Sequence, residues 1–173
     1  MGIVIIILFV LGGIVGYRRG LSLQALHFVG TLSALIIAAL NFNLLASRFD
    51  MILPYPAPGD VSAHTALTSL SDPEASFYRM GAFLIIFIVA KVTIQLIVSA
   101  FDYLQQVPIL GFVGSIISAA VGVVEMLIIV VVFLFMIALI PIEFIQNLVN
   151  GGLSQQLINN TFILSGRLKS WID

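Results

Sequence analysis

Four long apolar runs, separated by shorter polar segments, dominate the pattern of the chain. Crossing about 30 Å of hydrocarbon as a helix takes roughly 20 mostly apolar residues, with about 17 as the lower limit. The runs cover residues 1–17, 21–45, 77–101 and 112–140. We therefore predict an all-α polytopic membrane bundle of about four transmembrane helices, which together form one domain over residues 1–140.

The turn between the first two runs carries a concentrated positive charge. Its residues are Arg18, Arg19 and Gly20. Basic residues beside an apolar run favour a charged cap that holds a helical hairpin at the membrane interface. Binding of lipid phosphates is the alternative that these residues leave open.

The other two connections differ in length. Residues 46–76 form a hydrophilic loop, and near its end Ser71 and Glu74 fit a capping box that starts the next helix. Residues 102–111, which include Pro108, are few. So brief a connection predicts that the third and fourth runs form an antiparallel hairpin.

The tail, residues 141–173, is too polar to span a membrane. Its apolar residues recur near helical spacing, which predicts an amphipathic segment at the interface. Trp171 and Lys169 are of the types that anchor such segments.

Composition supports the membrane assignment and excludes several functions. The chain has 173 residues, of which 61% are apolar and 9% charged, against about 45–50% and about 25% in soluble proteins. Its net charge is −1, it has no Cys and two His, and it shows no hydrolase, zinc-protease or phosphate-loop motif. We expect no enzymatic activity, no metal or other cofactor, and no nucleic-acid partner.

Two charged residues, Lys91 and Glu125, lie near the centres of the third and fourth runs. An ionisable group at the bilayer centre costs about 2.5–3.5 kcal/mol on insertion scales, so each is a functional hypothesis. Both lie 17 residues from Pro108, one on either side. An antiparallel hairpin would place them at similar depth, which predicts an intramembrane ion pair. A pair that fixes helix register and a proton relay or polar path both remain open.

Helical spacing groups other residues into faces. The third run has a polar face that continues from Lys91 through Gln95, Ser99 and Asp102. The fourth run has a packing face of small residues, Gly111, Gly114, Ser118 and Gly122. Small residues let helix backbones approach closely in lipid, and we predict that these two faces meet. Gln24, His27 and Thr31 share one face of the second run.

Several short motifs occur in a consistent order along the chain. They are Arg19-Gly20-Leu21, Gln24-Ala25-Leu26, Pro54-Tyr55-Pro56, Phe77-Tyr78, Pro108 and the spaced residues Gly114, Ser118 and Gly122. In this order they resemble the colicin V production protein family, in the branch found in Gram-positive bacteria. The resemblance implies a protein of the bacterial cytoplasmic membrane with about four spans. It also implies a requirement in producing and exporting a peptide toxin.

Two functions follow as hypotheses. The first is a non-enzymatic, multi-pass membrane protein that supports toxin production, export or envelope maintenance, packed with copies of itself or with another membrane protein through the small-residue face. The alternative is a small oligomeric channel or transporter whose polar path runs around Lys91, Gln95 and Glu125. The lipid bilayer is the expected surrounding in both cases. Basic residues occur on both sides, so the orientation stays open.

Overall fold

Every regular element of the described chain is helical, which confirms the all-α prediction. The computed structural model describes residues 1–51, 55, 72–101, 110–140, 142–150, 152–161 and 164–172. In this part, three helices are long and apolar enough to cross a membrane: α1 (Gly2–Ala46), α2 (Pro73–Ser99) and α3 (Gly111–Ala138). A short 3-10 turn, η1 (Phe49–Met51), follows α1. The tail contributes α4 (Glu143–Val149), α5 (Leu153–Asn160) and α6 (Leu164–Ile172).

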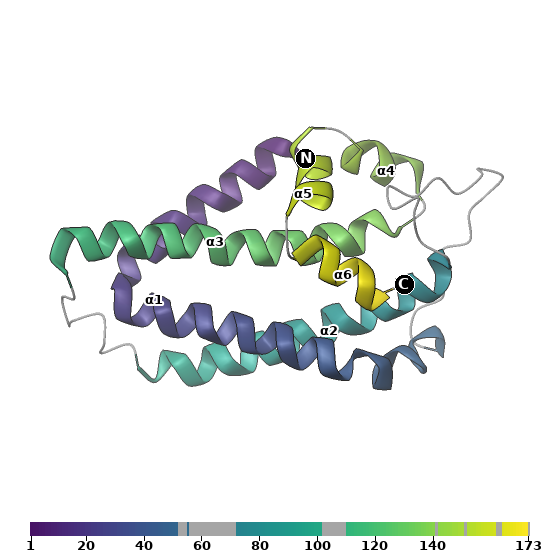
Figure 1. Ribbon diagram of the computed structural model, residues 1–173, viewed down its shortest axis with the longest axis horizontal. Helices are drawn as coiled ribbons and strands as arrows, with labels where there is room; N and C mark the ends of the chain where they lie inside the picture. Colours follow the sequence, from purple (N-terminus) through teal and green to yellow (C-terminus); the bar gives the residue numbers. More distant parts are fainter. Residues whose placement is uncertain are drawn as a thin grey trace.

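Helix α1 is broken at Gly20. This residue has φ 74° and ψ 165°, a conformation that only glycine adopts readily. Figure 1 shows the two halves of α1 leaving this point in different directions. Without the break, 45 residues would extend about 68 Å at 1.5 Å per residue, more than twice the hydrocarbon thickness. The break falls at Gly20, within the turn expected at residues 18–20, and a membrane crossing by each half of α1 stays a prediction.

Helix α1 is the centre of the packing. It contacts both α2 and α3 along much of their length, whereas α2 and α3 touch at few places. Helices α2 and α3 do run antiparallel, as the short connection predicts (Figure 1). Their turn, residues 102–109 with Pro108, lies outside the described residues.

The small-residue face of α3 packs on the first half of α1. A Cβ added at Gly12 would lie 2.7 Å from the Met126 Cβ and 2.9 Å from the Gly122 carbonyl oxygen. A Cβ on Gly122 would lie 3.0 Å from the Gly16 Cα. Ser118 donates a hydrogen bond to the Gly16 carbonyl across the same crossing. The prediction that this face meets the polar face of α2 is therefore wrong, because glycines four residues apart on α1 offer α3 a closer approach.

The start of α2 also differs from the prediction. Its N-cap is Asp72, whose Oδ1 accepts hydrogen bonds from the backbone N–H groups of Glu74 and Ala75, both at 3.1 Å. Pro73 then occupies the first turn, where its missing N–H leaves no donor unsatisfied. Ser71, the expected cap, lies outside the described residues. An aspartate before proline is the stronger signal here because proline limits how far upstream the helix can begin.

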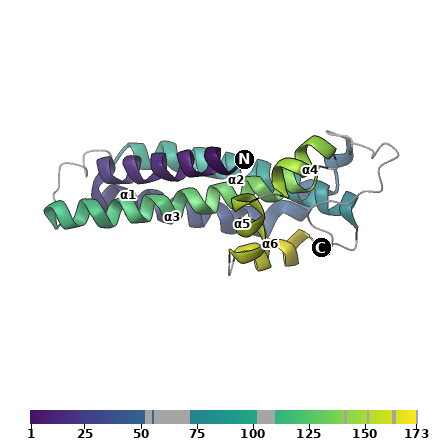
Figure 2. The ribbon, with the colours of Figure 1, turned by 90° about the horizontal axis from the view of Figure 1, so that it is seen from above.

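The tail packs on the bundle through one buried apolar residue in each helix: Val149, Ile158 and Leu168. Figure 2 shows α5 and α6 along one side of the long bundle. The Trp171 ring stacks on Phe83 of α2 with ring centres 5.9 Å apart, so protein rather than lipid covers one of its faces. The side chain of Lys169 lies outside the described part. An interfacial position of the tail stays a prediction, but its apolar face is already occupied by the bundle.

Large apolar side chains cover the outside of the long helices. Ile3, Leu40, Leu96 and Phe112 are 69–76% exposed. A soluble monomer rarely exposes apolar patches of this extent, whereas lipid tails accept them without penalty. The surface therefore agrees with the membrane assignment that composition predicts.

The crossing of α1 and α3 yields a stability prediction. Gly16→Ala forces a methyl group against the backbone of Ser118, so we expect a loss of about 1–3 kcal/mol of unfolding free energy. Denaturant titration in detergent micelles measures it. Gly2→Ala is the control, since a Cβ there meets only Leu153 at an ordinary 3.7 Å. Equal stability of the two variants would contradict the close crossing.

Candidate functional site

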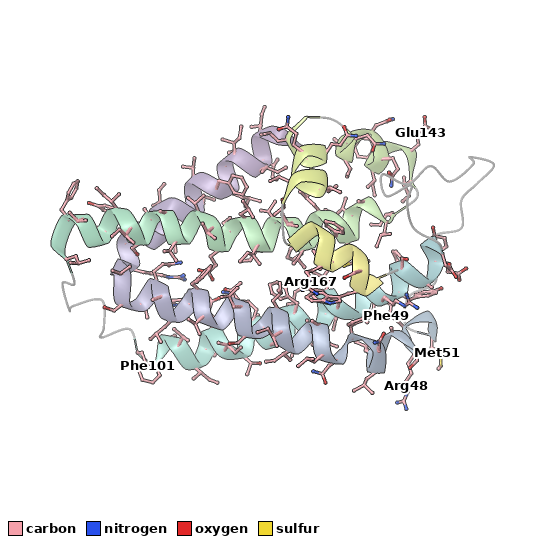
Figure 3. The ribbon with its side chains drawn as sticks, viewed as in Figure 1. Arg48, Phe49, Met51, Phe101, Glu143 and Arg167 are labelled. Atoms are coloured by element: carbon pink, nitrogen blue, oxygen red, sulfur yellow. The ribbon has the colours of Figure 1, made fainter. Side chains whose placement is uncertain are left out.

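Lys91 of α2 and Glu125 of α3 form an ion pair inside the bundle. The Lys91 Nζ contacts the Glu125 Oε1, and the two side chains are 13% and 8% exposed. Glu125 lies midway along α3. Figure 3 labels Phe101 at one end of the bundle and Arg48 and Met51 at the other, and α3 runs between these ends. The structure thus brings together the two residues that the chain arithmetic paired, far from both ends.

The second half of α1 completes the surroundings of this carboxylate. The Gln24 amide donates to the Glu125 Oε2 at 2.7 Å, and the Thr31 hydroxyl lies 2.6 Å from the Oε1. Lys91 also donates to the Thr31 hydroxyl oxygen. The Thr31 hydroxyl lies 3.0 Å from the His27 carbonyl as well, so its single proton is shared between two acceptors. Glu125 therefore joins α1, α2 and α3 through hydrogen bonds.

Sequence reasoning placed Gln24, His27 and Thr31 on one face of a helix but did not connect that face to Glu125. All three are buried. A carboxylate has about four lone-pair sites, more than one ammonium group can satisfy. Because Glu125 needs donors besides Lys91, the sequence could have indicated that this polar face supplies them.

A cavity of about 230 Å³ lies beside the ion pair. The first half of α1 forms one wall, α2 forms another, and α3 contributes Gly122 and Glu125. Five polar side chains line it: Arg19, Gln24, Lys91, Gln95 and Glu125. Backbone polar groups and charges in a membrane interior are tolerated where they line such a space.

The other residues of the predicted polar face of α2 do not share one environment. Gln95 is exposed and lines the cavity, whereas Ser99 is exposed and donates to the Leu96 carbonyl of its own helix at 2.7 Å. Asp102 lies outside the described residues. The polar face of α2 thus reaches the site through Lys91 and Gln95 only, among the residues described.

Residues of the small-residue face of α3 also differ from one another in burial, and so do the two arginines of the interfacial turn. Gly114 is buried, and Gly111 is exposed at the start of α3 with φ 51°. In the turn, Arg18 is exposed, whereas Arg19 is half-buried and lines the cavity. The two arginines therefore have different surroundings, which their adjacency in sequence does not reveal.

A second polar contact lies near the start of α2, at the end of the bundle far from the break at Gly20. The backbone N–H of Tyr55 donates to the Tyr78 hydroxyl oxygen at 3.1 Å, and its ring meets Phe77 edge to face. Burial raises the pKa of the Tyr55 hydroxyl, and the negative charges of Glu74 and Asp72 raise it further. The pKa shift follows from this packing and makes the phenol harder to ionise.

The described part of the chain holds no group of three or more His, Asp or Glu side chains placed to bind a metal ion. The polar groups that line the cavity are one carboxylate, two cations and two amides. These groups can bind and orient a polar solute or exchange protons with it.

Comparison with known proteins agrees with this architecture. Residues 1–162 match the family described as colicin V production protein. An uncharacterised transmembrane protein of Bacillus subtilis (strain 168), YshB, is 28% identical over 171 residues, which covers 98% of this chain and 95% of that protein. No solved structure matches the chain. Because the family match extends over most of the sequence, this membrane protein belongs to the colicin V production protein family.

Proposed function

We propose that this chain is a multi-pass protein of the bacterial cytoplasmic membrane that supports peptide toxin production, export or envelope maintenance without enzymatic catalysis. Family membership and the apolar outer surface support this role. The observation that carries it furthest is the half-open cavity beside the ion pair, which five polar side chains line together with apolar ones. A structural scaffold alone has no need of a cavity lined by charges.

The cavity favours a specific form of this role, a small channel or transporter. Lys91, Gln95 and Glu125 line one continuous space, which is what the polar path requires. A selective path combines favourable binding with ready release, and polar side chains supply both. The three long helices found in the described part of the chain make a small unit for transport, so an oligomer is part of this proposal.

We place the oligomer contact outside the small-residue face, which the sequence had suggested for it. Ser118 and Gly122 already pack on Gly12 and Gly16 within the same chain. A second copy or another membrane protein therefore docks on an outer face. Crosslinking in native membranes, followed by mass spectrometry of the captured proteins, identifies that face and its partner.

A flux assay tests the channel or transporter form. Proteoliposomes that contain the protein should show proton or solute flux, measured with an enclosed dye across a range of pH. Glu125→Gln should remove most of it, because the amide cannot carry the charge that Lys91 faces. Glu143→Gln is the matched control, since Glu143 is exposed on α4. Absence of any flux from the wild-type protein would exclude this form.

A strain that lacks the protein tests the wider role independently. Secreted peptide and envelope integrity, the latter followed by dye uptake, should both be measured with and without a restored copy. Unchanged secretion and unchanged dye uptake would contradict the support role, whatever the flux assay shows.

A charge swap tests how much stability comes from the ion pair itself and how much from the other hydrogen bonds to Glu125. Glu125→Lys alone should cost about 3–5 kcal/mol of unfolding free energy, the usual effect of leaving a buried charge unpaired. Adding Lys91→Glu should recover only part of this loss, because Gln24 and Thr31 donate to the carboxylate at position 125. Denaturant titration in micelles measures both. A swapped protein as unstable as the single variant would show that pairing contributes little.

A further inference from the structure

An open groove runs along the outer side of the first half of α1. Its volume is about 440 Å³, and it is lined by one residue of α3 and five of α1: Val123, Phe9, Val10, Gly13, Ile14 and Tyr17. Gly13 brings α1 close to α3 here, since an added Cβ would lie 3.3 Å from a methyl carbon of Val123. The lining surface is almost wholly apolar. The groove therefore suits an apolar occupant.

The spacing of large side chains disfavours a second helix as this occupant. Helices approach closely in lipid where small residues recur every four positions. Four residues before and after Gly13 the chain has large side chains, Phe9 and Tyr17. The small residues that do recur, Gly12 and Gly16, already pack on α3. A lipid tail is thin and flexible and needs no such spacing, so it fits the groove better than the helix of a second copy.

The groove also matches a lipid tail in length. Its α1 residues extend from Phe9 to Tyr17, a rise of about 12 Å at 1.5 Å per residue. One tail spans about half of the roughly 30 Å hydrocarbon core. Tyr17 lies next to the turn that contains the break at Gly20, and tyrosine is enriched where a membrane meets water. A tail that enters the groove at Tyr17 therefore extends towards Phe9.

Positive charge lies at the Tyr17 end of the groove. Arg18 is exposed and follows Val10 and Ile14 at four-residue spacing, so it continues one line of the groove lining. Side chains of a helix lean towards its N-terminus, which for Arg18 is the direction of the groove. Neither Arg18 nor Arg19 has a hydrogen-bond or ion-pair partner among the described residues. The end of the groove therefore offers a positive charge that no described acidic group neutralises.

Few other charges occur at this end of the bundle, where Figure 3 labels Phe101. Of the described residues, 17–24, 95–101 and 110–118 lie here, and Arg18 and Arg19 are their only charged members. The connection at residues 102–109 adds one acidic residue, Asp102. Two positive charges and one negative charge leave a net charge of +1. An anionic headgroup is therefore favoured over a zwitterionic one, whose cation meets more like charge than opposite charge.

We propose that the groove holds one tail of an anionic phospholipid whose phosphate binds Arg18. A guanidinium presents its N–H donors as a planar fork, which matches two oxygens of a phosphate. The groove and the cavity beside Lys91 and Glu125 have no lining residue in common. The lipid site therefore goes beyond the proposed function and does not depend on transport.

A fluorescent reporter in the groove tests the lipid preference. Tyr17→Trp places it there, where the native side chain is 46% exposed, and Trp171→Phe removes the one native tryptophan but keeps a ring beside Phe83. Vesicles contain phosphatidylcholine and phosphatidylglycerol, one of which carries brominated tails that quench the reporter on contact. Quenching should show phosphatidylglycerol bound about fivefold more tightly. Equal affinity of the two lipids would overturn the proposal.

Two exposed arginines near opposite ends of α1 provide matched variants. In the reporter protein, Arg18→Gln should bring the two lipids to within about twofold of each other. Arg48→Gln should leave the preference unchanged, because Arg48 lies at the far end of the bundle (Figure 3). Unfolding titrations check that both variants fold. A preference that survives Arg18→Gln would contradict the role of this side chain and overturn the proposal.

A bulky substitution tests whether the tail lies in the groove. Val10 and Val29 are 55% and 58% exposed on α1, and only Val10 lines the groove. Native mass spectrometry should show one phosphatidylglycerol retained by the wild-type protein and by Val29→Trp. Val10→Trp should retain it at least about threefold less. Equal retention by the two variants would show that the tail binds elsewhere.

The reporter also detects a different occupant. If neither brominated lipid quenches it, a second copy of the chain covers the groove in the vesicles, and the proposal is overturned. None of these measurements requires flux or secretion. Failure of the channel form therefore leaves the lipid site supported, and failure of the lipid site leaves the flux assay unaffected.

Discussion

A carboxylate held away from water needs hydrogen-bond donors around it, and this requirement organises the bundle around Glu125. Gln24 and Thr31 of α1 and Lys91 of α2 all donate to its two oxygens. Removing any one donor leaves a charged group less satisfied in a low-dielectric interior, where that deficit is large. The orientation of three helix segments about their axes therefore depends on one residue of α3.

Close backbone contact makes this arrangement possible. Gly12 and Gly16 let α3 approach the first half of α1, and the break at Gly20 then returns the chain so that Gln24 reaches the same carboxylate. The same geometry keeps α2 and α3 mostly apart, and the polar cavity lies beside the ion pair that links them. The cavity is therefore lined by all three long helices, at a place where α2 and α3 have little direct contact.

Most of the helical architecture was accessible from the sequence. The apolar runs predicted the long helices, the turn at residues 18–20 predicted the break in α1, and equal spacing from Pro108 predicted that Lys91 and Glu125 meet. The packing partner of Ser118 and Gly122 was not accessible in the same way. A stripe of small residues fits any other close-packing stripe, and helices that are apolar on nearly every side carry no hydrophobic pattern that distinguishes one neighbour from another.

The sequence by itself determined where helices form and which residues are too polar for lipid, because length and hydrophobicity along the chain control both. Only the tertiary structure decided that Gln24 and Thr31 serve Glu125, and that Arg19 rather than Arg18 faces the cavity. These assignments depend on how each helix is rotated about its axis. That rotation is set by contacts between segments far apart in the chain, and no local pattern encodes it.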